Sequence, residues 1–168
     1  MIPTDTFTNT ATFRPIRSAD NEQVARLIRT VMTEFGCVGE GYSINDAEVD
    51  AMYEAFSQPR AAFFVIKQEG RILGCGGIAP LAGSDGLTCE LKKMYFYPAL
   101  RGSGYGRRMV EQCLGSARAL GYRRCYLETV ERMTSANFLY QKTGFEKQCG
   151  AQGNTGHCSC DSYYVLEL

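Results

Sequence analysis

A glycine-rich turn between two apolar segments constrains the fold of this chain more than any other feature. The turn is Arg101-Gly102-Ser103-Gly104-Tyr105-Gly106, and it directly follows residues 88–97, which we expect to form a strand. Residues 104–120 then place apolar side chains on one helical face: Met109, Val110, Cys113, Ala117 and Leu120. Free amides at a helix N-terminus bind anions, and glycine permits close approach. The sequence therefore predicts a strand–turn–helix unit with a phosphate site.

The spacing of the glycines excludes two common phosphate ligands. The dinucleotide fingerprint is G-x-G-x-x-G, and after Gly102 and Gly104 its third glycine would fall on Arg107. A P-loop requires G-K-[ST] at the start of the helix, which this turn lacks. A tight connection without any ligand is the alternative, so the flanking segments must identify the ligand.

The periodicity of the remaining chain predicts one α/β domain, 11–168, with a central mixed sheet flanked by about four helices. Residues 1–10 are expected to be a flexible tail. Asn45 and Glu48 resemble a capping box at the start of the second helix. We expect strands at 13–16, 61–66, 71–79, 88–97, 124–129, from 145 onward and at 162–167, and helices beginning near 18, 45, 104 and 134.

Composition limits the partners of the protein. Lys and Arg together number 18, as do Asp and Glu, so no net charge attracts nucleic acid or an anionic membrane. The N-terminus lacks a signal peptide, and no apolar run approaches the ~20 residues of a membrane helix. We expect a cytoplasmic protein with no nucleic-acid or membrane partner. Its thiols should be free, including four cysteines in apolar segments: Cys75, Cys89, Cys113 and Cys125.

The single histidine lies in a cysteine-rich segment near the C-terminus. Cys149, His157, Cys158 and Cys160 lack the C-x₂₋₄-C pairs of closed zinc sites, so we expect no metal. We interpret the segment as a loop near the substrate site, with a purely structural role and a metal or redox role as alternatives. His157 is then a second candidate base.

Three ordered motifs resemble those of the GNAT acetyltransferases. R-x-x-G-x-G, here Arg101, Gly104 and Gly106, resembles the pyrophosphate-binding signature of that superfamily. Residues 90–98 are similar to the strand before that turn, and residues 136–145 resemble the family segment A-x-x-L-Y-x-K-x-G-F. The resemblance covers about residues 12–168, although the N-terminal half matches only in the order of its elements.

The resemblance implies a GNAT fold that binds acetyl-CoA as co-substrate. In this family the backbone of the strand before the turn pairs with the pantetheine arm, and the turn holds the pyrophosphate. The family commonly places an asparagine where this chain has Met133, and Asn137, one helical turn later, is a candidate replacement. The implied cofactor-binding residues are Met94, Tyr95, Phe96, Arg101, Gly102, Ser103, Gly104, Tyr105, Gly106, Arg107 and Asn137.

The resemblance also implies the catalytic pair Glu90 and Tyr140. An attacking ammonium must lose a proton, and Glu90 is the candidate base, directly or through water. Anchoring of the substrate and a structural role are the alternatives for Glu90. Tyr140 matches the general acid of the family, with core packing as its alternative.

The expected activity is direct acetylation of a primary amine on a small molecule or peptide. A non-catalytic acyl-CoA-binding module is the alternative, although the chain retains both Glu90 and Tyr140. The expected partner is the amine substrate, and assembly as a homodimer is left open.

Overall fold

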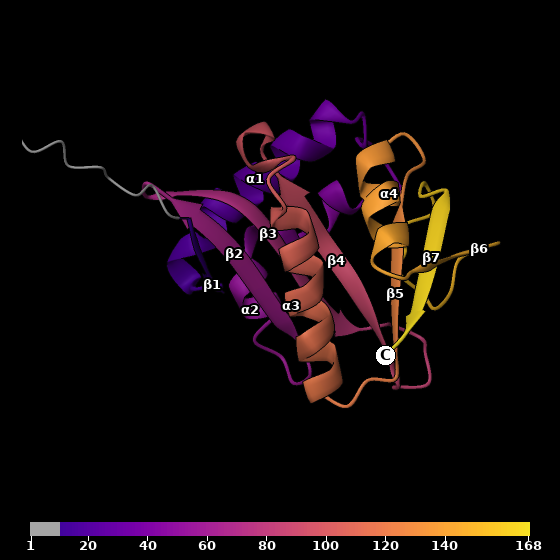
Figure 1. Ribbon diagram of the computed structural model, residues 1–168. Helices are drawn as coiled ribbons and strands as arrows, with labels where there is room; N and C mark the ends of the chain where they lie inside the picture. The colour runs from indigo at the N-terminus through magenta and orange to yellow at the C-terminus, as the bar shows by residue number, and fades with distance from the viewer. Residues whose placement is uncertain (1–10) are drawn as a thin grey trace, which may run out of the picture.

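The computed structural model describes residues 11–168, so the flexible tail predicted for residues 1–10 lies outside the described residues. A single mixed sheet runs through this part of the chain, with helices against both of its faces (Figure 1). The longer helices are α1 (Asn21–Glu34), α3 (Tyr105–Ala119) and α4 (Thr134–Lys142). The strands are β1 (Thr12–Pro15), β2 (Ala62–Gln68), β3 (Arg71–Pro80), β4 (Thr88–Phe96), β5 (Arg124–Thr129), β6 (Glu146–Gln148) and β7 (Ser162–Glu167).

The strands lie in the order β1-β2-β3-β4-β5-β7-β6, and the predicted mixed sheet is confirmed. Among the described strands, β4 and β5 form a parallel pair and the other neighbours are antiparallel. The paired residues of β4 and β5 run only from Thr88 opposite Arg124 to Glu90 opposite Tyr126. Beyond Glu90 the two strands part, which opens the middle of the sheet toward the C-terminal ends of both.

The two faces of the sheet bury separate apolar clusters. Helices α3 and α4 cover one face, with Met109, Cys113 and Tyr140 in its core. Helix α1 and the short α2 (Met52–Ala55) cover the other, with Leu27 and Ile28 in its core (Figure 1). The alternating side chains of β4 contribute to both clusters, so this strand connects the two halves of the molecule.

The second helix, predicted to begin near residue 45, does not form as one continuous α-helix. Residues 43–55 instead make two 3₁₀ turns (Ser43–Asn45 and Ala47–Asp50) and the single-turn α2. No capping box forms, because the Asn45 amide donates to the Gly39 carbonyl at 2.6 Å and Asp46 is extended. The apolar positions were identified correctly in part, since Val49, Met52 and Phe56 are buried while Tyr53 is exposed.

A bulge interrupts β4 just past the point where β5 separates. Lys93 has φ +55°, and the register with β3 shifts between Cys75 and Gly77. The bulge turns the Lys93 side chain inward, where it is only 1% exposed and pairs with Asp46. In the part of the chain that the structure describes, no helix is long and apolar enough to cross a membrane.

Candidate active site

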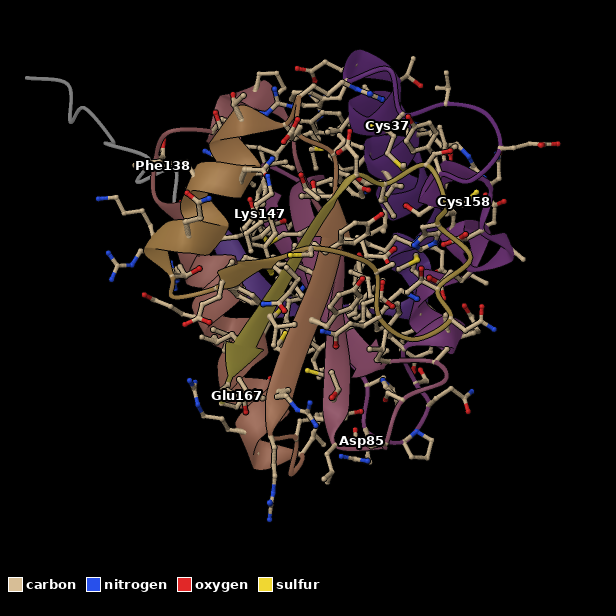
Figure 2. The ribbon with its side chains drawn as sticks, turned by 90° about the vertical axis from the view of Figure 1, so that its right-hand side faces the viewer. Cys37, Asp85, Phe138, Lys147, Cys158 and Glu167 are labelled. Atoms are coloured by element: carbon tan, nitrogen blue, oxygen red, sulfur yellow. The ribbon has the colours of Figure 1, made fainter. Side chains whose placement is uncertain are left out.

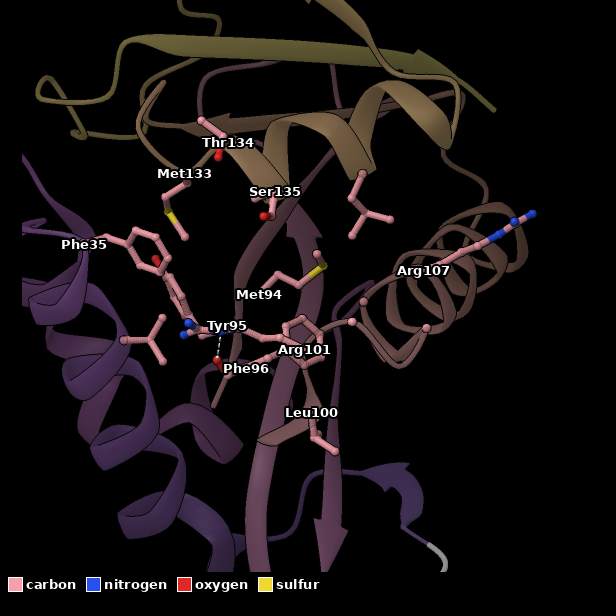
Figure 3. A pocket seen from close by; sticks show the side chains of 16 residues that line it. Phe35, Met94, Tyr95, Phe96, Leu100, Arg101, Arg107, Met133, Thr134 and Ser135 are labelled. Atoms are coloured by element: carbon pink, nitrogen blue, oxygen red, sulfur yellow. Dashed lines mark hydrogen bonds between the residues drawn. The ribbon is translucent and has the colours of Figure 1, made fainter. Parts of the chain in front are cut away.

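A cavity of about 400 Å³ opens where β4 ends and α3 and α4 begin (Figure 3). Phe35 from the end of α1, Met94 from β4 and Met133 from the start of α4 reach toward it from three directions. The cavity therefore lies between the two apolar clusters. Its full lining is Val31, Phe35, Met94, Tyr95, Phe96, Leu100, Arg101, Gly102, Gly104, Gly106, Arg107, Met133, Thr134, Ser135, Ala136 and Leu139.

The glycine-rich turn supplies one end of this cavity. Gly102 and Gly104 have φ of +74° and +82°, a left-handed conformation that costs other residues about 1–2 kcal/mol. Helix α3 begins at Tyr105, so its first amides are left free of bonds within the helix. Thr134 and Ser135 bring the N-terminus of α4 to the same cavity. Two helix N-termini thus favour a negatively charged ligand there.

The two predicted arginines lie at the cavity but are engaged elsewhere. The Arg101 guanidinium forms a two-pronged ion pair with Glu34, at 2.6 and 2.8 Å, and its Nε donates to the Phe96 carbonyl at 3.0 Å (Figure 3). Arg107 points away from the cavity and pairs with Glu111 on its own helix at 2.8 Å. Arg101 therefore joins α1 to the turn in this structure.

Eight of the eleven predicted cofactor-binding residues line the cavity, whereas Ser103, Tyr105 and Asn137 are outside its lining. The Asn137 amide donates to the carbonyls of Val130 and Met133, both at 2.9 Å. Its oxygen accepts from the Tyr164 hydroxyl at 2.7 Å. In this structure the polar atoms of Asn137 therefore join α4 to the segment after β5 and to β7, and its role in cofactor binding stays a prediction.

Tyr140 is buried beside the cavity, one position after the lining residue Leu139. Its ring packs against Phe145 and Tyr164, each with a ring centroid 6.0 Å away. Burial raises the pKa of the Tyr140 hydroxyl above its ordinary value, so the group stays protonated at neutral pH. The structure is compatible with core packing and with proton donation, and the acid role stays a prediction.

Glu90 is the last residue of β4 that pairs with β5, and its side chain is on the face of the sheet opposite α3. Its residue is only 6% exposed, and burial raises the pKa of its carboxyl above the ordinary value. A carboxylate with a raised pKa suits proton transfer. The base role of Glu90 nevertheless stays a prediction.

His157 meets carboxylates on two sides. Its Nε2 lies 3.0 Å from Asp46 Oδ2, and its Nδ1 lies 3.6 Å from Glu128 Oε2. The hydrogen bond to Asp46, followed by the contact with Glu128, raises the pKa of His157 to about 9. The imidazole is therefore a cation at neutral pH in this structure, which does not favour the candidate role of second base.

The predicted loop between the last strands holds His157 near the site. The 149–161 loop lies beside the end of α1 and the segment that follows it, since the Ser159 amide donates to the Gly41 carbonyl at 3.2 Å (Figure 2). Cys149 and Cys158 are exposed, and the eight cysteines are free thiols in the described residues.

Several residues of the cavity and of the cluster around His157 were not predicted from the sequence. Glu128 is carried by β5 and reaches the same cluster as Glu90, with its side chain only 2% exposed. Asp46 lies in the segment after α1 and binds both His157 and Lys93. Nothing in local sequence marks these contacts. The α4 end of the cavity had one signal in the sequence, which was the predicted start of a helix at Thr134 and Ser135, next to Met133.

Comparison with known proteins supports one family. The model of the "Acetyltransferase (GNAT) family" matches residues 24–145. The chain is 42% identical over 156 residues to an uncharacterized N-acetyltransferase, YjgM, of Escherichia coli, covering 92% of this chain and 93% of that protein. It is 35% identical over 92 residues to the IAA acetyltransferase of Azospirillum brasilense, covering 55% of this chain and 59% of that one.

Solved structures share the fold. A GNAT-family acetyltransferase of Staphylococcus aureus superposes with a TM-score of 0.81 at 16% identity, covering 94% of this chain and 99% of that one. A phosphinothricin acetyltransferase of Sinorhizobium meliloti, in complex with AcCoA, superposes with a TM-score of 0.76 at 22% identity, covering 95% and 89%. With the family model matching most of the domain, the chain belongs to the GNAT family of acetyltransferases.

Proposed function

We propose that the protein transfers the acetyl group of acetyl-CoA directly to a primary amine of a small molecule or peptide. One observation carries the proposal: a cavity between two helix N-termini and a buried carboxylate, that of Glu90, both lie along β4 where β5 separates from it. The cavity suits an acyl donor with phosphates, and Glu90 suits an acceptor that must lose a proton. The parted strands would let the two meet.

The cavity fits acetyl-CoA in its chemistry. Free amides at the N-termini of α3 and α4 would bind the pyrophosphate, with Gly102 and Gly104 permitting close approach. Met94 and Phe96 lie on the stretch of β4 beyond its pairing with β5, where the pantetheine arm would lie. In support, the related S. meliloti enzyme is described in complex with AcCoA.

The residues of the site meet the chemical demands of amine acetylation. Deprotonating a lysine-like amine at pH 7 costs about 4–5 kcal/mol, given a pKa near ~10.4. The Glu90 carboxylate would take that proton, directly or through water. The amine would then attack the thioester carbonyl, with a backbone amide of residues 94–96 stabilising the oxyanion. As the C–S bond breaks, Tyr140 would protonate the departing thiolate and regain a proton from the nitrogen as it becomes the amide. Met133 would line the acyl end of the cavity in place of an asparagine.

The test is release of free thiol from acetyl-CoA in the presence of amino acids, polyamines, aminoglycosides and peptides. We expect thiol release that depends on one class of amine, with the acetylated amine identified by mass spectrometry. Glu90→Gln should lower turnover on the order of 10²–10⁴-fold, the range of general base catalysis. Tight acetyl-CoA binding without transfer to any amine would contradict the proposal and favour the non-catalytic module. Cytoplasmic location and assembly as a homodimer stay predictions.

A further inference from the structure

Three potential metal ligands from separate parts of the chain meet beside the parted strands. They are Glu90 on β4, Glu128 on β5 and His157 on the 149–161 loop, each offering one ligand atom within 4.8 Å of the others. The cluster is removed from solvent, since the Glu128 side chain is 2% exposed and the His157 side chain 10%. The sequence spacing did not predict this site, because strand order alone brings these residues together.

Glu90 points into the cluster without a partner of its own. Among residues 11–168, the structure gives its carboxylate no hydrogen bond and no ion pair, although the residue is only 6% exposed. The cations around it are engaged with other carboxylates: Lys92 binds Glu48 at 2.8 Å, Lys93 binds Asp46, and His157 lies between Asp46 and Glu128. An unpaired buried carboxylate is costly, and a bound cation removes that cost.

The spacing between His157 and Glu128 suits ligands of one metal better than a hydrogen bond. Nδ1 and Oε2 are 3.6 Å apart, which is too long for a hydrogen bond. Two ligand atoms on a tetrahedral zinc ion, each about 2.0–2.1 Å from the metal, are about 3.4 Å apart. The observed separation is within a few tenths of an ångström of that value.

The surrounding residues orient these ligands as the outer shell of a metal site does. The other imidazole nitrogen, Nε2, lies 3.0 Å from Asp46 Oδ2, so Nε2 would keep its proton while a metal displaces the proton of Nδ1. Glu128 accepts hydrogen bonds at 2.8 Å from the hydroxyls of both Tyr126 and Thr155. A carboxylate–histidine pair and a hydrogen-bonded carboxylate are the usual supports of metal ligands.

We propose that Glu90, Glu128 and His157 bind one divalent transition-metal ion of the zinc type, with water in the remaining position. Two carboxylates and one imidazole are a ligand set that such ions accept. An occupied site would engage the carboxylate proposed as the base, so metal should inhibit acetyl transfer. That consequence rests on the proposed function, whereas metal binding does not and is measured without substrates.

The test is titration of the 168-residue chain with Co²⁺ followed by visible absorption, then displacement by Zn²⁺. Exposed Cys149 and Cys158 are changed to serine in every sample, because free thiols bind both ions. We expect one saturable equivalent, a cobalt spectrum without thiolate charge transfer, and a rise in the melting temperature with Zn²⁺. His157→Gln and Glu128→Gln should each weaken binding at least about tenfold.

Controls separate a bound ion from a simple ion-paired cluster. Glu131→Gln removes a carboxylate that is 72% exposed on the following loop and should leave the affinity unchanged. Glu90→Gln is the second ligand variant, because Glu90 makes no hydrogen bond whose loss would unfold the protein. Circular dichroism checks that each variant is folded. No saturable binding, or binding that the ligand variants leave unchanged, would overturn the proposal.

Discussion

At the scale of single residues, Tyr140 is either the general acid or a packing residue, and only the first role needs its hydroxyl. If Tyr140 is the general acid, Tyr140→Phe should lower kcat about 10²–10⁴-fold while the binding of acetyl-CoA changes little. Steady-state kinetics with a donor-binding measurement give both values. The matched control is Tyr122→Phe, since the buried Tyr122 hydroxyl donates to the Arg60 carbonyl at 2.8 Å and lies outside the cavity lining. Equal losses in kcat and donor binding would instead make Tyr140 a packing residue.

Asn137, the candidate replacement for the asparagine of the family, has hydrogen bonds that also serve stability. Asn137→Ala removes three hydrogen bonds at about 1 kcal/mol each, so we expect it to lower the free energy of unfolding by about 2–3 kcal/mol. Tyr164→Phe removes one of these bonds and should cost about 1 kcal/mol. Denaturant unfolding measures both. A stable Asn137→Ala protein with a raised KM for acetyl-CoA would return Asn137 to the cofactor site.

At the scale of elements, the contact between α3 and α4 depends on a glycine. A Cβ at Gly106 would lie 3.0 Å from Leu139 Cδ2, and Leu139 lines the cavity. Gly106→Ala should therefore move Leu139 and raise the KM for acetyl-CoA, by less than about tenfold. Gly115→Ala is the matched control in the same helix, where a Cβ has nothing within 4 Å. Gly115→Ala should stabilise the protein by about 0.5–1 kcal/mol and leave the KM for acetyl-CoA unchanged. Equal KM values in the two variants would contradict this account.

Regular elements were predicted well because their periodicity is local. The apolar stripe of α1 and the strand alternation around the glycine turn follow from side-chain spacing alone. The segment 43–55 failed because its conformation depends on distant partners. There Asn45 binds Gly39, Lys93 pairs with Asp46 from the bulge of β4, and Asn21 accepts the Tyr53 amide at 2.8 Å.

At the scale of the whole molecule, stability in acid should depend on Asp20, which ties β1 to the start of α1. The residue is 3% exposed, and its carboxylate has Arg14 at 2.7 and 2.9 Å and the Arg17 amide at 2.8 Å. Burial alone would raise the pKa of Asp20, but these hydrogen bonds outweigh it and lower the pKa below 3.8. The stabilisation is therefore complete well above pH 3.8 and is lost as the pH falls through the lower, folded value.

Asp20→Asn should lower the free energy of unfolding by about 2–3 kcal/mol at pH 7. The difference from the unchanged protein should shrink as the pH falls below about 4. Glu22→Gln is the control, because its carboxylate is 84% exposed in an ion pair with Arg26 and should matter by less than about 0.5 kcal/mol. Chemical unfolding at several pH values measures the trend, and a difference that does not vary with pH would contradict it.

The sequence by itself determined the mixed α/β sheet and the glycine turn at the start of α3, because helix periodicity and glycine conformation are properties of neighbouring residues. The residues of β4 that line the cavity were indicated by the resemblance to the GNAT family and not by a local rule. Only the tertiary structure decided which acidic side chains share the site. Glu90, Glu128 and His157 meet because β5 pairs with β4 over three residues and the 149–161 loop returns beside α1. Contacts between residues so distant in sequence depend on strand order and packing, which no local pattern encodes.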